Sequence, residues 1–424
     1  MGVLLGAIAD DFTGATDLCN TLVRRGMRSV QLIGLPDTGM AVPDAEAVVI
    51  ALKSRTIPAA EAVAMSLAAL RWLREAGARQ ILFKYCSTFD STDSGNIGPV
   101  ADALLGALNC DFTLFCPAFP ENGRTIFKGY LFVGDVLLSE SGMRDHPLTP
   151  MRDPSLVRVL QRQTKHRVGL VPYGAVAGGA AAIRETFAAL RHSGVRHAVV
   201  DAIEDRDLEA IGEAAADLPL VTGGSGIALG LPENFRRQGL LGAGAAADVL
   251  PAVGGAAAVL SGSCSEATQA QVAHMINAGE GRTFILNPLV LAGRPDLAAD
   301  ALAWAEPLLG ERPILIASTA GPELVARIQA ELGRERAGAL VEAAMGQIAK
   351  GLVARGVRRL VVAGGETAGA VVQALGVRGL RIGPQIDPGV PWTASLGAEP
   401  LALALKSGNF GAPDFFLRAF DVLG

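Results

Sequence analysis

Two adjacent carboxylates, Asp10 and Asp11, follow the apolar run of residues 3–9 near the start of the chain. The run predicts a buried strand, and residues 14–26 after it have apolar side chains at helical spacing. Asp11 alone could simply cap that helix, because an Asp at a helix start accepts from free backbone N–H groups. A second carboxylate beside it is repelled by the first unless a cation or a hydroxyl group binds to it. The pair therefore points to a polar site, with capping by Asp11 as the alternative.

Two further predicted strands, residues 45–52 and 80–86, also lead into polar side chains. The carboxyl ends of parallel strands lie at one edge of a sheet, where α/β proteins bind ligands. The candidate residues of this edge are Asp10, Asp11, Lys53, Ser54, Arg55, Lys84, Ser87, Thr88, Asp90 and Ser91. Arg can bind a carboxylate with two parallel hydrogen bonds, and Asp can accept from a hydroxyl group or take its proton. This mixture suits a polyhydroxylated carboxylate as substrate.

Lys84 is the most informative of these residues because it lies inside an apolar strand. Burying a lysine without a partner costs several kcal/mol, so a carboxylate is expected beside it. A purely structural ion pair is the alternative to a catalytic role.

The second half of the chain contains turns of small residues between a predicted strand and a predicted helix. Glycine lets backbone N–H groups approach phosphate oxygens, and the free amides of a helix start favour an anion. Such turns also occur as plain connections. The candidates for a nucleotide site are Ser261 and Ser263, then Gly364, Gly365, Glu366 and Thr367, and Gly408 near the C-terminus.

Other glycine-rich stretches are ambiguous, and several known nucleotide-binding and catalytic motifs are missing from the sequence. Residues 221–230 read equally well as a phosphate cradle or as a hinge, and residues 242–247 read as a linker. The sequence contains no Gly-Lys dipeptide, which excludes a Walker A loop, and neither HRD nor DFG, which excludes the ordinary protein-kinase signature. The histidines show no catalytic or zinc pattern.

Composition indicates a globular protein that acts on small molecules. The chain has 424 residues, 50% of them hydrophobic, and a formal net charge of -5, so no electrostatic footprint for nucleic acid or for a membrane surface is visible. The apolar start lacks the basic region of a signal peptide. The five cysteines form no CxxC pair, which indicates reduced thiols and a cytoplasmic location. The oligomeric state stays open, a homodimer included.

Short aliphatic runs alternate with helical patterns along the whole chain, which predicts an α/β fold with largely parallel sheets. A chain of this length usually forms more than one domain. Residues 234–258 are rich in Gly and Ala without a clear period, so we place the boundary there. The prediction is two α/β domains, residues 1–240 and 255–424, with a cleft between them.

Six motifs in this order resemble the four-carbon acid sugar kinases over essentially the whole chain. They are "ADDFTGATD", "KYCSTFDST", "VTGGSG", "SGSCS", "AGGET" and "SGNFG". The resemblance is strongest to the members that phosphorylate 3-oxo-tetronates, such as 3-dehydro-erythronate, at the terminal hydroxyl with ATP. Members that act on D-threonate or D-erythronate carry similar motifs and stay as alternatives.

The resemblance implies an N-terminal domain that binds the sugar acid and a C-terminal domain that binds ATP with Mg²⁺. Ser261, residues 364–367 and Gly408 would contact ATP, together with Ser263. Asp11, Asp90 and Lys84 are the catalytic candidates, without a choice of base between the acids. Asp10, Lys53, Ser54, Arg55 and Ser87 are the substrate-binding candidates. No residue is assigned to a metal. A non-catalytic protein that binds a small acid between two lobes is the rival hypothesis from a different class.

Overall fold

The structure, a computed structural model, describes residues 2–37, 39–146, 148–242, 246–278, 282–294, 296–310 and 312–423. The chain forms two compact units, which divide at residues 247 and 248. The division falls in the Gly/Ala-rich stretch. Residues 243–245 of the proposed linker lie outside the described residues.

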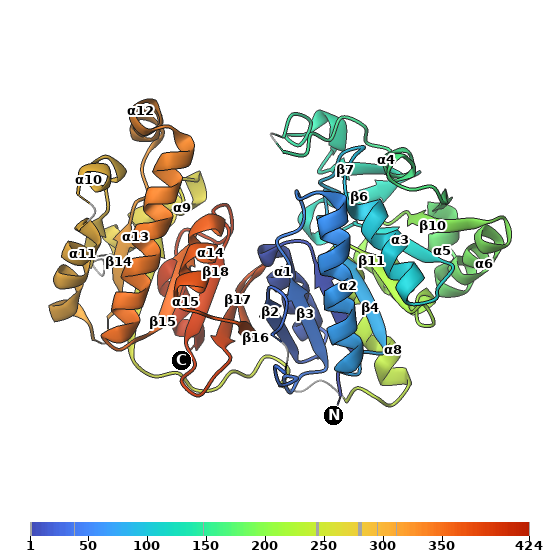
Figure 1. The fold of residues 1–424 in the computed structure, drawn as a ribbon, viewed down its shortest axis with the longest axis horizontal. Helices are drawn as coiled ribbons and strands as arrows, with labels where there is room; N and C mark the ends of the chain where they lie inside the picture. The colour runs from blue at the N-terminus through green and yellow to red at the C-terminus, as the bar shows by residue number, and fades with distance from the viewer. Residues whose placement is uncertain are drawn as a thin grey trace. The chain divides into compact units, whose positions relative to one another are not determined.

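Unit 1 is built on a parallel sheet with the strand order β2-β3-β1-β4-β11-β5-β10-β9 (Figure 1). The strands are β1 (Leu5–Ala9), β2 (Ser29–Ile33), β3 (Ala47–Ala51), β4 (Gln80–Lys84), β5 (Thr113–Cys116), β9 (Arg167–Val171), β10 (Val195–Val200) and β11 (Leu220–Gly223). Their side chains are almost entirely buried in β1, β3 and β4, as expected for strands covered on both faces. The centre of the sheet is therefore part of the core.

Helices cover both faces of this sheet. They are α1 (Phe12–Arg24), α2 (Ala59–Glu75), α3 (Ile97–Ala107), α4 (Leu156–Gln163), α5 (Tyr173–Ala177), α6 (Gly179–His192), α7 (Asp205–Ala214) and α8 (Leu231–Arg237). Helices α2 and α3 pack together on the face nearest the viewer in Figure 1, and α1 contacts β2 and β3 from the other face. A small antiparallel sheet of β6 (Arg124–Phe127), β7 (Tyr130–Val133) and β8 (Val136–Leu137) is inserted between β5 and α4.

Unit 2 has the strand order β13-β14-β12-β15-β18-β17-β16. The strands are β12 (Ala256–Ser261), β13 (Arg282–Ile285), β14 (Ile314–Ala317), β15 (Val357–Ala363), β16 (Gly379–Asp387), β17 (Val390–Ser395) and β18 (Ala402–Lys406). The helices are α9 (Glu266–Asn277), α10 (Pro288–Gly293), α11 (Leu297–Ala305), α12 (Pro322–Leu332), α13 (Arg334–Ala354), α14 (Gly365–Ala374) and α15 (Phe415–Leu423). Strands β13, β14, β12, β15 and β18 pair in parallel, each with the next in this order. Strand β17 pairs antiparallel with β18 and with β16.

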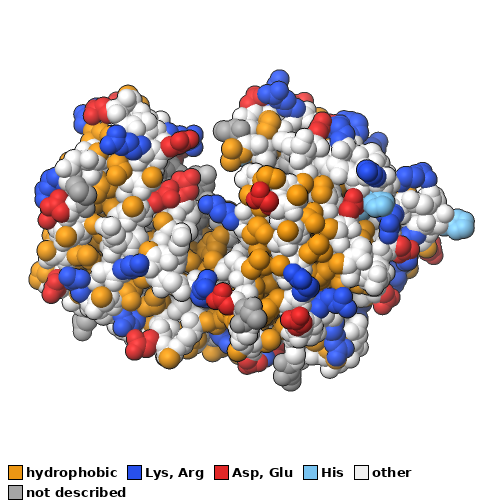
Figure 2. Space-filling model, in the orientation of Figure 1, with side chains coloured by type: hydrophobic (Ala, Val, Ile, Leu, Met, Phe, Trp, Pro, Cys, Tyr) orange, Lys and Arg blue, Asp and Glu red, His pale blue; other side chains and the backbone are white. Residues whose placement is uncertain are grey.

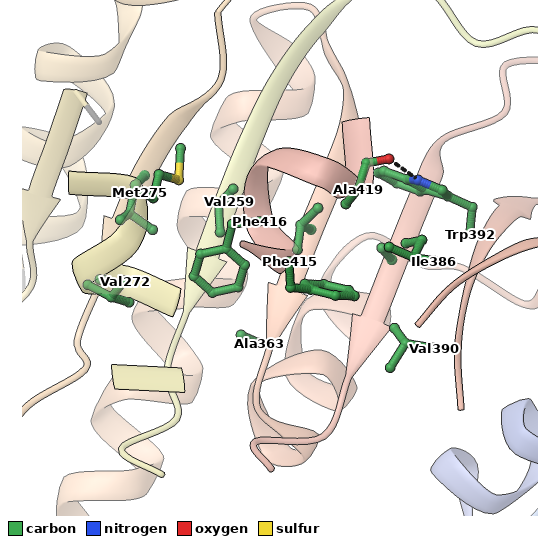
Figure 3. Close-up of a cluster of buried hydrophobic side chains, with 14 of the residues drawn as sticks. Val259, Val272, Met275, Ala363, Ile386, Val390, Trp392, Phe415, Phe416 and Ala419 are labelled. Atoms are coloured by element: carbon green, nitrogen blue, oxygen red, sulfur yellow. Dashed lines mark hydrogen bonds between the residues drawn. The ribbon is translucent and has the colours of Figure 1, made fainter. Parts of the chain in front are cut away.

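One face of the unit 2 sheet is covered by α9 and α15, whose apolar side chains form a buried cluster with the strands (Figure 3). Phe415 and Phe416 are 0% and 1% exposed, and Trp392 of β17 is 0% exposed. The indole Nε1 of Trp392 donates to the carbonyl oxygen of Ala419 at 2.6 Å, so this buried donor is satisfied. The cluster fixes α15 to the sheet.

The predicted α/β fold with largely parallel sheets in two domains is confirmed. The prediction was incomplete in two places, since it did not include the inserted sheet β6-β7-β8 or the antiparallel pairing of β16, β17 and β18.

The glycines of residues 221–230 are explained by packing. The stretch is buried throughout. A Cβ on Gly223 would lie 2.4 Å from the carbonyl oxygen of Cys116, and one on Gly226 would lie 2.5 Å from that of Ala118. The glycines therefore let this segment approach the backbone after β5, and they are not an open phosphate cradle.

The surface agrees with the charge balance of the sequence. On the face shown in Figure 2, Lys and Arg side chains are interspersed with Asp and Glu side chains. Partly exposed ion pairs of the chain include Arg28–Asp44 at 2.9 Å. All five cysteines are free. Within the described ranges, no helix combines the length and the apolar character needed to cross a bilayer.

Candidate active site

The sequence candidates of unit 1 come together at the carboxyl ends of β1, β3 and β4. Ala9 at the end of β1 lies level with Ala51 of β3 and Lys84 of β4, because the three strands are parallel neighbours. The backbone N–H groups of Ser54 and Arg55 both donate to the carbonyl oxygen of Asp10, at 2.9 and 3.2 Å. These bonds hold the turn after β3 against the end of β1.

Asp10 and Arg55 form a bidentate ion pair. Arg55 Nε donates to Asp10 Oδ2 at 2.7 Å and Arg55 Nη2 donates to Asp10 Oδ1 at 2.9 Å. The side chain of Asp10 is 6% exposed and that of Arg55 is 23% exposed. Burial raises the pKa of Asp10, and the Arg55 guanidinium offsets this only in part. Asp10 thus fixes the plane of the guanidinium and leaves its remaining donors directed at other carboxylates.

Asp11 has two roles at once. Its Oδ2 accepts from the backbone N–H of Gly14 at 3.1 Å, so it caps α1 as the alternative interpretation held. Its Oδ1 accepts from Arg55 Nη2 at 2.6 Å and from Lys84 Nζ at 3.3 Å. Burial acts to raise the pKa of Asp11, but the charges of Lys84 and Arg55 and the N–H of Gly14 reverse this and hold it well below its usual value. Asp11 is therefore ionised at any physiological pH.

Lys84 is 4% exposed and reaches Asp11 across the first turn of α1. Burial alone would lower the pKa of Lys84, but the carboxylates of Asp11 and Asp10 outweigh burial and raise it. The expected carboxylate partner of this lysine is thus present. Gly14 makes the contact possible, since a Cβ at this position would lie 1.6 Å from Lys84 Nζ and 2.3 Å from Asp11 Oδ1.

Gly14→Ala is expected to displace the Lys84 ammonium and to lower the turnover of the reaction at this site by roughly 10–100-fold, because misplacing a positioned group by about 1 Å has effects of this size. The fold should survive, because alanine favours a helix by about 1 kcal/mol over glycine. Turnover and thermal unfolding of the purified variant measure the two effects separately.

Gly106→Ala is the matched control for this substitution. Gly106 also lies in a helix of unit 1, and a Cβ there would meet no atom of the described residues within 4 Å. Turnover of Gly14→Ala equal to that of Gly106→Ala would show that the position of Lys84 does not matter for the reaction.

Asp90 completes the polar cluster after β4. Its Oδ1 accepts from Thr88 Oγ1 at 2.6 Å, and its Oδ2 lies 3.6 Å from Arg55 Nη1. Cys86 Sγ lies 3.0 Å from the same Thr88 hydroxyl, and burial raises the pKa of this thiol to about 11. The thiol is therefore protonated and is a hydrogen-bonding group of the site.

Asn96 locks the turn that carries Arg55, and the sequence interpretation missed it. Its side-chain Nδ2 donates to the carbonyl oxygens of Ser54, Arg55 and Ile57 at 2.7, 3.3 and 3.2 Å. An Asn in the polar segment just before α3 was the only signal. The structure leaves Lys53 exposed and Ser87 half-buried, whereas Ser54 is 4% exposed.

In unit 2, three turns interlock at the ends of β12, β15 and β18. Gly262 and Ser263 donate their N–H groups to the carbonyl oxygen of Ala363, and Gly364 donates to that of Lys406. Gly364 has φ 121°, which an L side chain rarely adopts. A Cβ on Gly408 would lie 2.4 Å from Ser263 Oγ. The glycines at these positions are therefore needed for the turns to lie this close together.

A cavity of about 450 Å³ opens at these turns, within the range of small-ligand sites. Helix α14 begins at Gly365, so its free N–H groups lie beside the cavity. The lining includes six of the seven predicted ATP residues: Ser263, Gly364, Gly365, Glu366, Thr367 and Gly408. This arrangement of small residues and a helix start can hold phosphate oxygens.

Ser261, the seventh predicted ATP residue, is 0% exposed and supports the cavity lining indirectly, through Thr319. Thr319 Oγ1 donates to the carbonyl oxygen of Ser263 at 2.9 Å, so Ser261 Oγ donates to Thr319 Oγ1 at 2.7 Å. Thr319 was missed. It is the last residue of the predicted strand 313–319, so the rule applied to the other strand ends would have found it.

Lys406 is a second buried lysine, and it was not among the predicted site residues. It is 1% exposed, and its Nζ donates to Thr268 Oγ1 and to the carbonyl oxygens of Ser407 and Gly408 at 3.1, 3.0 and 3.2 Å. Burial lowers the pKa of Lys406 to about 8. The side chain therefore anchors the turn that presents Gly408 to the cavity.

Lys406 should make stability rise with pH. Between about pH 8 and 10.5 the unfolded chain binds a proton at this lysine that the folded chain does not, so the free energy of unfolding increases with pH across this window. The gain of the wild type over Lys406→Met should reach about 2 kcal/mol in urea denaturation between pH 7.5 and 10. A pH-independent difference would contradict the assignment. Lys350→Met, at an exposed lysine of α13, controls for the removal of a charge.

No metal ligand was predicted. Among the described residues, no cluster of three or more His, Cys, Asp or Glu side chains is arranged to hold a metal ion.

Comparison with known proteins divides the chain as the two compact units of the structure do. A family model described as a sugar-binding N-terminal domain matches residues 5–231, and one described as a nucleotide-binding C-terminal domain matches residues 258–416. The 3-oxo-tetronate kinase of Cupriavidus necator is 65% identical over 99% of this chain and 97% of its own. That of Salmonella typhimurium is 47% identical over 98% of both chains.

Solved structures agree over the full length. A crystal structure of a Salmonella typhimurium LT2 protein covers 98% of both chains at 46% identity with a TM-score of 0.91. The crystal structure of Haemophilus influenzae protein HI1011 covers 99% of this chain and 100% of its own at 45% identity with a TM-score of 0.87. The resemblance seen in the motifs is thereby confirmed: the chain belongs to the four-carbon acid sugar kinase family and is closely related to the 3-oxo-tetronate kinases.

Proposed function

We propose that this protein is an ATP-dependent kinase that phosphorylates the terminal 4-hydroxyl of a 3-oxo-tetronate, giving the 4-phosphate and ADP. The observation that carries the proposal is the 65% identity, over nearly the whole of both chains, to a relative named 3-oxo-tetronate kinase. The polar cluster of unit 1 and the glycine-lined cavity of unit 2 supply the two kinds of site that this reaction needs.

The sugar acid would bind at the polar cluster of unit 1. Arg55 and Lys84 are its two cations, and they face the three carboxylates of Asp10, Asp11 and Asp90. A substrate carboxylate would compete with these acids for Lys84 or for the outer donors of Arg55. Asp10 would act on the substrate through Arg55, because both of its oxygens already accept from that side chain. Lys53, Ser54 and Ser87 are the further binding groups at this edge.

Asp11 or Asp90 would accept the proton of the 4-hydroxyl as its oxygen forms a bond to the γ-phosphorus of ATP and the bond to the ADP oxygen breaks. Asp11 is favoured, because its side chain is 28% exposed against 10% for Asp90. Lys84, which touches Asp11, would neutralise the transferring group. In phosphoryl transfer, positioning and charge neutralisation supply most of the catalysis.

ATP would place its phosphates on the turns of unit 2. Ser263, Gly364, Gly365, Thr367 and Gly408 line the cavity there, and Ser261 would support them through Thr319. Mg²⁺ binds through one or two carboxylates together with substrate phosphates. Glu366 at the start of α14 is a carboxylate of this kind beside the turns, so the residues present fit such an ion.

Transfer requires the acceptor oxygen within about 3–3.5 Å of the γ-phosphorus. The proposal therefore includes the predicted cleft between the two domains, residues 1–240 and 255–424, and its closure to exclude water. A cytoplasmic location, a homodimer and membership of the phosphotransferases with an alcohol acceptor belong to the same proposal.

Coupled measurement of ADP release with 3-dehydro-erythronate, D-threonate and D-erythronate tests the function. The 3-oxo acid should give the highest kcat/KM, and omitting the acid should leave only slow ATP hydrolysis. A higher kcat/KM for D-threonate or D-erythronate would reassign the substrate. Binding of a sugar acid that calorimetry shows to be independent of ATP and Mg²⁺, with no ADP release, would favour a binding protein.

A further inference from the structure

Helix α13 contains three glycines, and two of them are required by packing. A Cβ on Gly351 would lie 2.3 Å from Leu302 Cδ1, and a Cβ on Gly346 would lie 3.0 Å from Ala374 Cβ. These glycines let α13 approach α11 and α14. Close packing therefore accounts for the helix propensity that is lost at both positions.

Gly338 has no such reason among the residues that the structure describes. A Cβ built there would have one neighbour within 4 Å, the Oε1 atom of Glu342 at 3.7 Å, which is ordinary contact. The backbone φ of Gly338 is not positive, and the residue lies inside the helix. A glycine inside a helix costs about 1 kcal/mol relative to alanine, so the absence of a side chain at 338 calls for an explanation outside the folded chain.

Gly338 lines the cavity that begins at the phosphate turns. Ala337 and Val341 of α13 and Val325 and Ile328 of α12 line the same cavity. Residues 334, 337, 338, 341 and 342 follow helical spacing, so they share one face of α13. The cavity thus joins a surface suited to phosphates with a wall of small and branched apolar side chains, which Gln329, Arg334 and Glu342 flank with polar groups.

We propose that this face of α13 is the seat of the nucleobase of ATP, and that Gly338 is a specificity-determining residue that keeps the seat open for the flat base. The inference rests on the proposed function and deepens it. A purine is apolar on both faces and needs a wall without projecting side chains on at least one of them, which residues 337 and 338 provide next to the branched side chains of α12.

Gly338→Leu tests the proposal. Leucine suits a helix, and its side chain would fill the open space at position 338. We expect the Kd for ADP and the KM for ATP to rise at least 10-fold, while the KM for the sugar acid stays within 2-fold of wild type. Calorimetry with ADP and steady-state kinetics give these values, and a thermal melt checks the fold.

Ala343→Leu is the matched control, because Ala343 is an exposed residue of the same helix outside the cavity lining. The Kd of the Ala343→Leu variant for ADP should equal that of wild type.

Gly338→Ala covers the case in which leucine prevents folding. The Tm of this variant should be at or above that of wild type, while its Kd for ADP rises by about 3-fold. An ADP Kd within experimental error of wild type in a folded Gly338 variant would overturn the nucleobase seat alone. A wild-type protein that binds neither ADP nor ATP would overturn the proposed function, and the seat with it.

Discussion

Replacing Arg55 with methionine is expected to lower the free energy of unfolding of unit 1 by about 3–5 kcal/mol, because it leaves buried Asp10 without its cation. Both oxygens of Asp10 accept from this one side chain, and its carboxylate is 6% exposed. Asp11 and Asp90 would lose the same neighbour, so three carboxylates would face Lys84 alone. Urea denaturation at pH 7.5 measures the loss, and kinase turnover should vanish with it.

The deficit of Arg55→Met should depend on pH. Without the guanidinium, burial alone acts on Asp10 and raises its pKa further above the unfolded value of 3.8. When the pKa of a carboxyl is higher in the folded than in the unfolded chain, its ionisation destabilises the folded state at pH values above the folded pKa. This destabilisation disappears at low pH, where the carboxyl is protonated in both the folded and the unfolded chain. The difference between wild type and variant should therefore shrink as the pH falls from 7.5 toward 4.

Two further variants separate the buried charge from other effects. Asp10→Asn in the Arg55→Met background removes the unpaired charge and should recover part of the lost stability. Arg158→Met breaks a pair of similar geometry with Asp153, 2.6 Å apart, but Arg158 is 53% exposed, so its loss should stay within about 1 kcal/mol. Equal losses in Arg55→Met and Arg158→Met would refute the idea that burial makes the first pair costly to break.

The edge that carries Asp10, Arg55 and Lys84 could be predicted from sequence because it depends on local patterns. Apolar runs with helices between them predict parallel strands, and parallel strands bring their carboxyl ends together whatever the loops do. The pairing of Ala9 with Ala51 and Lys84 shows this directly.

The contacts within the site could not be predicted in the same way. That Gly14 leaves room for Lys84 follows from how closely α1 passes over β4, and no spacing along the chain reports such a distance. The apolar residues Val325 and Ile328 of α12 look in sequence like ordinary core positions, and only the folded chain shows them lining a cavity.

Strands β16 and β17 were missed for a different reason. Pro384 lies inside β16 and Pro391 inside β17, and proline argues against a strand because it cannot donate a ladder hydrogen bond. The structure accommodates both prolines where the register shifts, between Ile382 and Gln385 and between Gln385 and Asp387. An irregularity in the pairing thus tolerates residues that the sequence pattern treats as breaks.

Asp11→Asn is expected to lower kcat by about 10²–10⁴-fold, the range associated with loss of a general base. Asparagine caps a helix as well as aspartate does, so its side-chain oxygen can still accept from the N–H of Gly14 and α1 should remain intact. The Tm should still fall, because buried Lys84 loses the carboxylate that it contacts. Asp11→Ala should lose the cap in addition, and with it about 1 kcal/mol more. Coupled ADP release at saturating ATP and sugar acid measures kcat.

Asp90→Asn, assayed beside Asp11→Asn, decides between the two carboxylates. If Asp11 accepts the proton, Asp90→Asn should cost less than about 10-fold in kcat, because Asp90 would then act only by hydrogen bonding with Thr88 and by its charge near Arg55. The reverse order of the two losses would make Asp90 the base.

The wild-type pH profile gives an independent check on Asp11. Because the pKa of Asp11 lies well below its usual value, protonation of this carboxylate cannot cause a fall in kcat between pH 8 and 5. A fall in that range that disappears in Asp11→Asn would contradict the ion pair of Asp11 with Lys84, on which the low pKa depends.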